Sequence, residues 1–398
     1  MTLDGRTVVL GITGGIAAYK GPELVRRLRD AGARVQVVLT RNAQRFVSPL
    51  ALQSVAGAPV SMDLFDPGEE SRIGHIRLAD EADVVLVAPA TANLIAKLAL
   101  GIADDLLTTL LLATRAPVVI APAMNVHMLA DATVRSNLAA CVARGIHVVQ
   151  PDSGLLACGY EGEGRLPDPP ELIEATLTAL ATPDLSGETV LVTAGPTREA
   201  LDPVRFLSNR SSGRMGFEIA RAARRRAARV VLVSGPTALA PPSGVEFVSV
   251  ESAAEMARAV ATHSVAATVV IAAAAVADYR PVAASPQKQA KTGAEFTLHL
   301  VPTTDVVASA VERHAGLVVV GFAAETHDVV ARARAKLTRK RLDLIVANDV
   351  TAEGAGFDVE TNVVTLIDPH QSHALPCLPK SEVADAILDW VVRARRGV

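Results

Sequence analysis

Aromatic side chains are scarce in this chain: phenylalanine, tryptophan and tyrosine make up 3% of its 398 residues, although half of all residues are hydrophobic. Alanine, valine and leucine must therefore form the interior, which suits helices packed on a parallel sheet. The chain is also too long for one ordinary core, so we expect two domains.

Cysteine is rare as well. The chain has three cysteines, Cys141, Cys158 and Cys377. Their odd number and wide spacing exclude a disulfide framework and a cysteine-based zinc site. The N-terminus does not read as a signal peptide, and every apolar run of membrane-spanning length is interrupted by glycine, proline or charge. We therefore expect a protein of the reducing cytoplasm that does not enter a membrane.

A strong excess of one charge is missing too. The formal net charge is -3, and acidic and basic residues are mixed along the chain. A nucleic-acid-binding protein should have a basic face, so we expect no nucleic acid partner. Small anionic ligands need only local charge and stay possible.

The chain does contain a repeated pattern of apolar strands and amphipathic helices. Residues 6–13 predict a strand, 14–32 a glycine turn and helix, and 33–40 a second strand, which together form a βαβ unit with parallel strands. Further strands are predicted at 82–90, 116–124 and 145–151. Apolar strands that alternate with helices indicate a doubly wound α/β domain.

The pattern restarts after a helix that begins near Pro169 and a linker at 182–187. Strands are predicted at 189–197, 229–237, 245–250, 268–279, 317–326 and 343–349, helices at 211–228 and 381–396, and antiparallel edge strands at 296–301 and 362–368. The sequence thus predicts an α/β protein of two doubly wound, Rossmann-like domains with mostly parallel sheets, at 1–182 and 187–398.

The glycine turn after the first strand, Gly11 to Gly15, predicts a phosphate site. Its exposed backbone N–H groups and the following helix N-terminus favour an anion, and Thr13 can add a hydroxyl. The spacing differs from the dinucleotide motif G-x-G-x-x-G, so we favour a mononucleotide. The alternative is that these glycines serve only tight packing.

Polar residues follow two neighbouring strands of the same predicted sheet. Pro89 to Asn93 come after one strand, and Met124 and Asn125 after the next. Ligands bind at such strand ends in open α/β sheets, although a solvated loop asparagine is the simpler interpretation of Asn125 alone. His75 precedes the first of these strands and titrates near neutral pH, so it is a candidate acid or base; a surface or capping histidine is the alternative.

Four stretches of the first half together carry a resemblance. Residues 11–20 (GITGGIAAYK), 74–93 (GHIRLADEADVVLVAPATAN), 121–125 (APAMN) and 152–168 (DSGLLACGYEGEGRLPD) resemble the flavin-dependent cysteine decarboxylases. They are most similar to the decarboxylase half of the bacterial bifunctional phosphopantothenoylcysteine decarboxylase/phosphopantothenate–cysteine ligases. The resemblance continues through the second half and covers nearly the whole chain.

This resemblance implies bound FMN and a homotrimeric unit with sites between subunits. It assigns His75 as the catalytic histidine, Asn125 as the contact of the substrate carboxylate and Cys158 as the cysteine of a flexible flap. A cysteine thiol is mostly protonated at neutral pH and could supply the last proton; a passive small residue is the alternative. The positions that it implies for FMN are Gly14, Gly15, Ile16, Thr40, Thr91, Asn93 and Met124.

In the second half, Ser211 and Ser212 precede a predicted helix and favour an anion at its N-terminus. Lys336 and Lys340 are spaced to share one helix face, which could also be merely solvated. Residues 208–216, 274–281, 321–326 and 347–350 resemble the ligase half of the same enzymes, which joins cysteine to phosphopantothenate by using CTP through an acyl-cytidylate.

The ligase resemblance implies that Asn209 handles the acyl-cytidylate and that Lys288 acts on the phosphates. Asp278 could hold Mg²⁺ through water, since Mg²⁺ commonly takes one or two carboxylates plus phosphates. The implied CTP positions are Ala272, Ala273, Ala274, Asp278, Lys288, Thr304, Asp305, Val306, Val307, Phe322, Lys336 and Lys340. Two motifs depart from the family: its K-x-K-K is KQAK at 288–291, and Thr304 replaces the proline of P-D-I-V.

The expected function is therefore two consecutive steps of coenzyme A biosynthesis: CTP-dependent ligation of cysteine to 4'-phosphopantothenate, then FMN-dependent decarboxylation of phosphopantothenoylcysteine to phosphopantetheine. Family resemblance also implies a dodecamer of decarboxylase trimers joined by ligase dimers. The alternatives are a regulatory relative without activity, a decarboxylase of peptide C-terminal cysteines, and a pyridine-nucleotide oxidoreductase.

Overall fold

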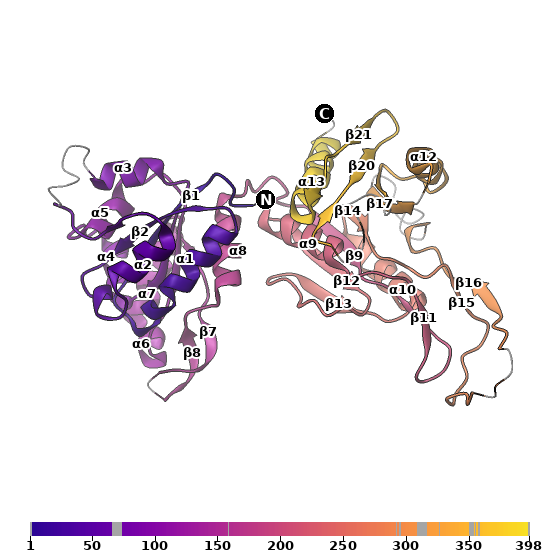
Figure 1. Ribbon diagram of the computed structural model, residues 1–398, viewed down its shortest axis with the longest axis horizontal. Helices are drawn as coiled ribbons and strands as arrows, with labels where there is room; N and C mark the ends of the chain where they lie inside the picture. Colours follow the sequence, from indigo (N-terminus) through magenta and orange to yellow (C-terminus); the bar gives the residue numbers. More distant parts are fainter. Residues whose placement is uncertain are drawn as a thin grey trace. The chain divides into compact units, whose positions relative to one another are not determined.

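The chain folds into two compact units, Thr2–Ala181 and Thr182–Val398, here called the first and second domains (Figure 1). The computed structural model describes residues 2–65, 74–157, 159–291, 293, 296–308, 317–325, 327–349, 354, 356, 359–396. None of the helices in these ranges is long and apolar enough to cross a membrane.

The first domain contains a six-stranded sheet in the order β3-β2-β1-β4-β5-β6. All neighbouring strands pair in parallel. The strands are β1 (Thr7–Ile12), β2 (Arg34–Leu39), β3 (Val60–Ser61), β4 (Val84–Ala90), β5 (Val118–Pro122) and β6 (His147–Val148). The strand order reverses between β1 and β4, where a doubly wound sheet has its ligand crevice.

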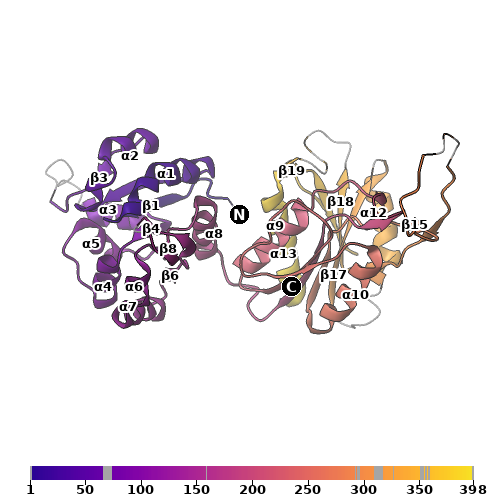
Figure 2. The ribbon, with the colours of Figure 1, turned by 90° about the horizontal axis from the view of Figure 1, so that it is seen from below.

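Helices cover both faces of this sheet (Figure 2). One face carries α1 (Gly21–Asp30), α2 (Pro49–Ala56) and α8 (Pro169–Leu180), which pack against one another and against the strands. The other face carries α3 (Gly74–Glu81), α4 (Ala92–Leu100), α5 (Leu106–Ala113) and α7 (Ala132–Ala143), whose leucines and Cys141 form one apolar cluster with β1, β2, β4 and β5. The described part of the domain also contains the short helices η1 (Ile16–Lys20), η2 (Ala43–Arg45) and α6 (Val126–Ala130).

The second domain contains an eight-stranded sheet in the order β13-β12-β9-β14-β17-β18-β20-β21. The strands are β9 (Thr189–Ala194), β12 (Arg229–Ser234), β13 (Glu246–Ser249), β14 (Val269–Ala272), β17 (Val318–Glu325), β18 (Leu344–Asp349), β20 (Val364–Ile367) and β21 (Ser372–Ala374). The strands from β13 to β18 pair in parallel, whereas β20 and β21 are antiparallel. The predicted fold class, two doubly wound domains with mostly parallel sheets, is thereby confirmed.

Helices cover this sheet on both faces as well. α9 (Arg214–Arg225) and α13 (Lys380–Arg396) pack together on one face, where their apolar side chains share a core with the strands. α10 (Ala253–His263) and α12 (Val329–Arg339) pack in two smaller apolar clusters on the other face. A short helix, η4 (Ser264–Ala266), follows α10.

Among the described residues, four antiparallel strand pairs lie outside the two main sheets. They are β7 (Asp152–Leu155) with β8 (Glu161–Arg165), β10 (Arg198–Ala200) with β11 (Phe206–Ser208), β15 (Tyr279–Pro281) with β16 (Leu300–Pro302), and β19 (Thr361–Asn362) with β22 (Leu378–Pro379). The expectation of edge strands at 296–301 and 362–368 was only partly right. β16 is shorter and pairs with β15 away from the main sheet, and β20 lies one position inside the edge because β21 flanks it.

The predicted linker at 182–187 belongs in part to the second core. Leu185 is fully buried there. The half-buried carboxylate of Asp184 forms two hydrogen bonds of 2.7 Å with the guanidinium of Arg226, which also contacts Asp389 at 2.7 Å. These hydrogen bonds hold the pKa of Asp184 below its usual value. Arg226 is nearly buried, so its charge depends on these partners.

We predict that Arg226→Met lowers the free energy of unfolding of the second domain by about 3 kcal/mol, because it leaves the Asp184 carboxylate without its partner. The matched control is Arg229→Met, which removes the exposed ion pair with Glu246 and should cost about 0.5 kcal/mol. Urea unfolding of the full chain measures both. Because the pKa of Asp184 is lowered on folding, the difference should be complete above pH 5 and shrink as the pH falls below about 4. Equal losses for the two variants would contradict the assignment.

Candidate active sites

A cavity of about 670 Å³ lies in the first domain, beyond the carboxyl ends of β1, β4 and β5. We call it the first-domain cavity. Its wall consists mainly of apolar side chains and glycine backbone, and its size is typical of a small-molecule site. The lining residues are Gly14–Ala17, Tyr19, Lys20, Thr91, Ala92, Ala123–Asn125, Met128, Leu155–Ala157 and Gly164–Leu166.

Thr13 joins the two loops that flank the strand-order reversal. Its hydroxyl donates to the carbonyl of Pro89 at 2.7 Å and accepts from the N–H of Thr91 at 3.0 Å. Both hydrogen-bonding roles of this buried hydroxyl are thereby used within the protein. That Thr13 adds a hydroxyl to a phosphate site stays a prediction, because its proton is donated here to the carbonyl of Pro89.

The two glycines at the end of the turn differ in what they allow. A Cβ at Gly14 would lie 2.4 Å from the Cβ of Asn42, so this position is needed for tight packing. A Cβ at Gly15 would have no protein atom nearer than 3.5 Å, because this backbone borders the cavity. The packing alternative thus explains Gly14, whereas Gly15 leaves backbone accessible to a ligand.

The β7–β8 hairpin forms the other wall of the cavity. Gly164 brings it close to the loop after β5: the N–H of Met124 donates to the carbonyl of Gly164 at 3.1 Å, and a Cβ at Gly164 would lie 2.2 Å from the carbonyl oxygen of Met124. Near the hairpin turn, the ring of Tyr160 meets His127 edge-on at a centroid distance of 5.2 Å. A glycine-rich sequence is therefore required for the hairpin to lie against the cavity.

The structure gathers most, but not all, of the cofactor positions expected in this domain. Gly14, Gly15, Ile16, Thr91 and Met124 line the cavity. Thr40 does not line it, and its hydroxyl donates to the carbonyl of Ile12 at 3.3 Å. Asn93 does not line it either and is exposed on α4.

The structure describes two of the three expected catalytic positions of this domain, and these two do not share the cavity. Asn125 lines the cavity and is the N-cap residue of α6. Its Oδ1 accepts a hydrogen bond from the N–H of His127 at 2.8 Å. His75 is half-buried on α3 and is not among the residues that line this cavity. Cys158 lies outside the described residues, but Leu155, Leu156 and Ala157, which precede it, border the cavity.

The second domain has two adjoining cavities along the carboxyl ends of β14, β17 and β18. The larger cavity, about 450 Å³, extends from Asn209 to Asn362, and the smaller cavity, about 320 Å³, extends to Lys340. They share Ala274, Val276, Asp278, Phe322 and Lys336. Together they contain every CTP position expected among the described residues except Lys288.

Buried threonines fix the loop between the two cavities. The hydroxyl of Thr193 accepts from the N–H of Ala274 at 3.2 Å, and that of Thr197 accepts from the N–H of Ala277 at 2.9 Å. Asn209 reaches the same loop from the other side and donates its amide to the carbonyl of Val276 at 2.9 Å. The small residues of this loop leave backbone exposed to both cavities.

Two lysines of α12 face the shared region, and both are engaged. Lys336 donates to the carbonyl of Phe322 at 2.8 Å, and burial lowers the pKa of its ammonium, with nearby Lys340 adding to the effect. Lys340 pairs with Asp305 at 2.7 Å. Burial opposes ionisation of Asp305, but the hydrogen bonds from Lys340 and from the N–H groups of Ala308 and Val307 outweigh it and lower its pKa. The interpretation of this helix face as merely solvated is therefore wrong.

Lys288 and Asp278 occupy different surroundings. Lys288 is exposed within residues 279–291 and 296–302, which we call the arm and which extend away from the rest of the second domain (Figures 1 and 2). Lys288 lines neither cavity. Asp278 is exposed and borders both, and the described residues contain no cluster of three or more metal-ligating side chains.

Several lining residues were not expected from the sequence. In the first domain, Lys20 holds the hairpin base by donating to the carbonyl of Leu166 and contacting Asp168 at 3.2 Å. In the second domain, Asn348, Asn362 and Lys380 form the far end of the larger cavity. Asn348 lies in the quoted stretch 347–350, whereas no motif marked Asn362 or Lys380.

Comparisons with known proteins match both domains. Residues 1–181 match the family model described as Flavoprotein, and residues 185–394 match that of the DNA/pantothenate metabolism flavoprotein C-terminal domain. The coenzyme A biosynthesis bifunctional protein CoaBC of Vibrio cholerae is 48% identical over 393 residues, and that of Bacillus subtilis is 47% identical over 395. The first match covers 98% of each chain; the second covers 98% of this chain and 97% of its relative.

A solved structure, the C-terminal domain of a CoaBC protein, is 41% identical and covers 55% of this chain and 100% of its own, with a TM-score of 0.47. The full-length relatives already match across both domains at nearly half identity, which confirms the resemblance found in the sequence. This chain belongs to the family of the coenzyme A biosynthesis bifunctional protein CoaBC.

Proposed function

We propose that the second domain joins cysteine to 4'-phosphopantothenate at the expense of CTP, and that the first domain decarboxylates the product to phosphopantetheine. The observation that carries this proposal is the match of one chain to both halves of CoaBC proteins over 98% of its length. The gathering of the expected residues around cavities at the carboxyl edge of each sheet supports it. We place the protein in the cytoplasm.

The first-domain cavity fits FMN. Its apolar wall suits a flat ring system, and Gly15 exposes backbone that a larger residue would cover. Gly15, Ile16, Thr91 and Met124 would hold the cofactor. When bound, FMN supplies a reversible acceptor for two electrons, which the removal of CO₂ from a cysteine derivative requires.

The residues of this chain would bind and protonate the substrate. The hydrogen bond from the backbone N–H of His127 to Oδ1 orients the side-chain amide of Asn125. The N–H groups of this amide complement a carboxylate. The Cys158 thiol would donate the final proton, and His75 would act as acid or base. Because His75 does not line the cavity of its own chain, it would act in the cavity of a second copy, which supports a trimeric decarboxylase unit with sites between subunits.

The second domain fits a nucleotide triphosphate with Mg²⁺. Residues 304–307, Lys336 and Lys340 line the smaller cavity, and Asp278 presents an exposed carboxylate at the junction. Mg²⁺ held by one carboxylate, through water, and by phosphates suits Asp278, because the other carboxylate of this cavity, Asp305, is paired with Lys340. Asn209 lies where the carboxylate of phosphopantothenate would be activated, so the domain contributes mainly positioning and charge neutralisation.

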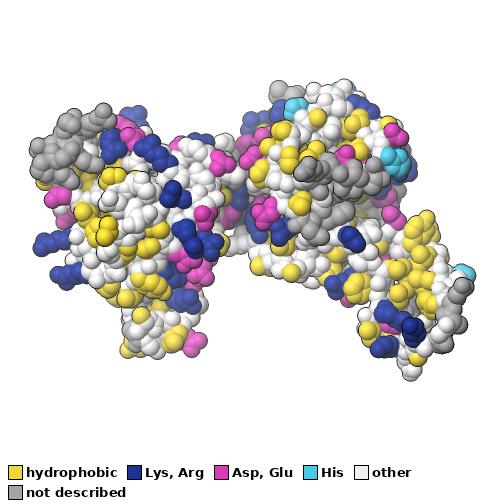
Figure 3. Space-filling model, in the orientation of Figure 1, with side chains coloured by type: hydrophobic (Ala, Val, Ile, Leu, Met, Phe, Trp, Pro, Cys, Tyr) yellow, Lys and Arg dark blue, Asp and Glu magenta, His cyan; other side chains and the backbone are white. Residues whose placement is uncertain are grey.

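The arm supports association of second domains. Figure 3 shows hydrophobic side chains gathered on it. Arm and β10–β11 hairpin lie side by side, since the Ser285 N–H donates to the Leu201 carbonyl at 2.9 Å. Their exposed apolar residues are Val204, Phe206, Tyr279, Val282, Phe296 and Leu300. A surface of this kind favours a second copy, in keeping with ligase dimers that join decarboxylase trimers into a dodecamer.

The first test is one reaction mixture of purified protein, phosphopantothenate, cysteine, CTP and Mg²⁺, followed by mass spectrometry. We expect phosphopantetheine and CMP in equal amounts, and a yellow protein. Accumulation of phosphopantothenoylcysteine would support the ligase assignment of the second domain but refute the decarboxylase assignment of the first. Unused CTP would refute the ligase, and no product of either kind would favour a regulatory relative.

We predict that Cys158→Ala still releases CO₂ from phosphopantothenoylcysteine but forms no phosphopantetheine, because the variant lacks the final proton donor. Trapping of ¹⁴CO₂ measures decarboxylation, and mass spectrometry of the product measures phosphopantetheine formation separately. The matched control is Cys377→Ala, which removes an exposed thiol of the second domain and should leave both unchanged. Normal phosphopantetheine output from Cys158→Ala would exclude the role.

We predict that Lys288→Ala lowers ligation at least tenfold and changes decarboxylation of added phosphopantothenoylcysteine less than twofold. Removal of a phosphate-binding cation weakens stabilisation of the charge on pyrophosphate as it leaves. CMP release and CO₂ release measure the two activities in one preparation. Lys291→Ala is the comparison variant on the same arm. A parallel loss of ligation and decarboxylation in Lys288→Ala would indicate misfolding rather than a lost phosphate contact.

A further inference from the structure

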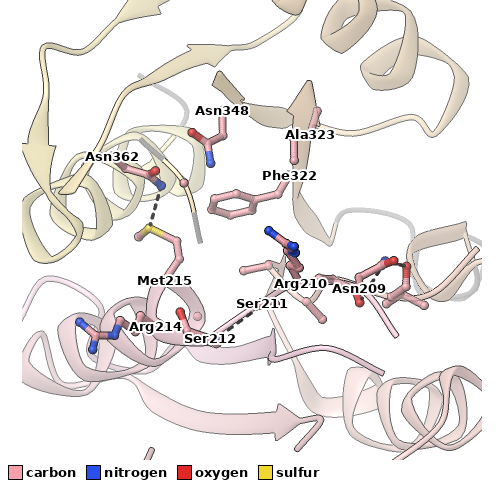
Figure 4. Close-up of a pocket in the computed structure, with 18 of the residues that line it drawn as sticks. Asn209, Arg210, Ser211, Ser212, Arg214, Met215, Phe322, Ala323, Asn348 and Asn362 are labelled. Carbon is pink, nitrogen blue, oxygen red and sulfur yellow. Dashed lines mark hydrogen bonds between the residues drawn. The ribbon is translucent and has the colours of Figure 1, made fainter. Parts of the chain in front are cut away.

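Two asparagines at the far end of the larger cavity have side-chain oxygens for which the described part of the chain offers no hydrogen-bond partner. Asn348 is 9% exposed and Asn362 is 3% exposed. Neither Oδ1 atom has a partner among the residues that the structure describes. The amide nitrogen of Asn362 has a long contact, 3.9 Å, to the sulfur of Met215 (Figure 4). Buried amides are normally satisfied, so two unsatisfied ones in a single cavity wall indicate a ligand.

Both asparagines are held on regular structure, so the wall that they form is built before a ligand arrives. Asn348 lies in β18, where it pairs with Ala324 of β17 on one side and Val364 of β20 on the other. Asn362 lies in β19 and pairs with Leu378 of β22. Side chains on paired strands are positioned more precisely than those on loops.

The position of the pair separates it from the proposed CTP site. Residues 304–307 and Lys340 line the smaller cavity alone, whereas Asn348 and Asn362 line the larger cavity alone. Phe322 and Lys336 lie where the two cavities meet. A nucleotide in the smaller cavity therefore leaves the asparagine end of the larger cavity for another substrate.

The surroundings of the pair decide between the two remaining substrates. Met215 and Phe322 present apolar surface beside the amides, and the N-terminus of α9, preceded by Ser211 and Ser212, lies along the same cavity (Figure 4). Arg210, Arg214 and Lys380 line the same cavity and would complement an anionic end of a ligand, whereas the two amides complement uncharged donors. Cysteine is a small zwitterion without an uncharged middle, so it matches this combination less well. Phosphopantothenate has a hydroxyl and an amide N–H as donors, two methyl groups beside them, a phosphate at one end and a carboxylate at the other.

We propose that Asn348 and Asn362 bind the uncharged middle of phosphopantothenate, with their oxygens accepting from its hydroxyl and amide N–H. The methyl groups then pack against Met215 and Phe322, and the carboxylate points toward Asn209 at the junction with the smaller cavity. This inference rests on the proposed ligase function and assigns to the larger cavity a substrate-specificity role. The pair selects the hydroxyl because a substrate without it leaves a buried acceptor unpaired.

The experiment compares phosphopantothenate with its analogue that has hydrogen in place of the secondary hydroxyl. CMP release is measured with the full-length wild type and with Asn362→Leu and Asn348→Leu. The wild type should use the analogue with kcat/KM at least tenfold lower. At least one variant should show a KM for phosphopantothenate raised tenfold or more, values for CTP and cysteine within twofold of wild type, and a hydroxyl preference reduced to less than threefold.

The control Gln371→Leu removes an exposed amide that lines neither cavity and should retain the wild-type preference. An increased KM for CTP or cysteine alone would assign the asparagines to that substrate and overturn the proposal. Equal use of phosphopantothenate and its analogue by the wild type would also overturn the proposal. This comparison needs no variant, so it remains decisive even if both variants fail to fold. If the wild type releases no CMP from phosphopantothenate, cysteine and CTP, the ligase function itself fails, which is a different result.

Discussion

Both domains depend on hydrogen bonds that buried threonine hydroxyls donate or accept where the strand order reverses. Loops after the two central strands of a doubly wound sheet diverge, so a crevice opens that must be held at a fixed width. Thr13 bridges it in the first domain, binding both Pro89 and Thr91. In the second domain, Thr193 and Thr197 bind the N–H groups of Ala274 and Ala277. A threonine suits this place because its hydroxyl can donate and accept while its methyl packs in the core.

The chemistry of each cavity comes from what is added to this shared frame. The first domain adds a glycine-rich hairpin, and Gly164 lets it approach Met124 closely enough to complete an apolar wall. The second domain adds α12, which brings Lys336 and Lys340 to the end of its sheet, and the arm. A doubly wound sheet that tolerates such additions can bind a redox cofactor in one domain and a nucleotide in another. The added residues rather than the fold therefore decide the function.

The sequence predicted the central strands and covering helices well, because runs such as residues 7–12 and 84–90 are buried on both faces and remain continuously apolar. It failed where partners are distant or exposed. The β7–β8 and β10–β11 hairpins carry little apolar alternation, and β16 pairs with a strand about 20 residues away. Motifs located Asn125 and Phe322 at cavities. The burial of Asn362 depends on β19 and β22 meeting, which no local pattern records.

Charged side chains line both cavities of the second domain, but the two cavities differ in how their polar groups are paired. In the smaller cavity, Lys340 is held by Asp305, and Lys336 is buried against the carbonyl of Phe322, so both cations are positioned at the cost of desolvation. Such preordered cations attract phosphates strongly but distinguish poorly among molecules that carry them. At the asparagine end of the larger cavity, neutral amides bind weakly unless donors match their geometry. Under the proposed function, affinity for the activating nucleotide and selection of the acid to be activated can therefore be set by different residues of one continuous site.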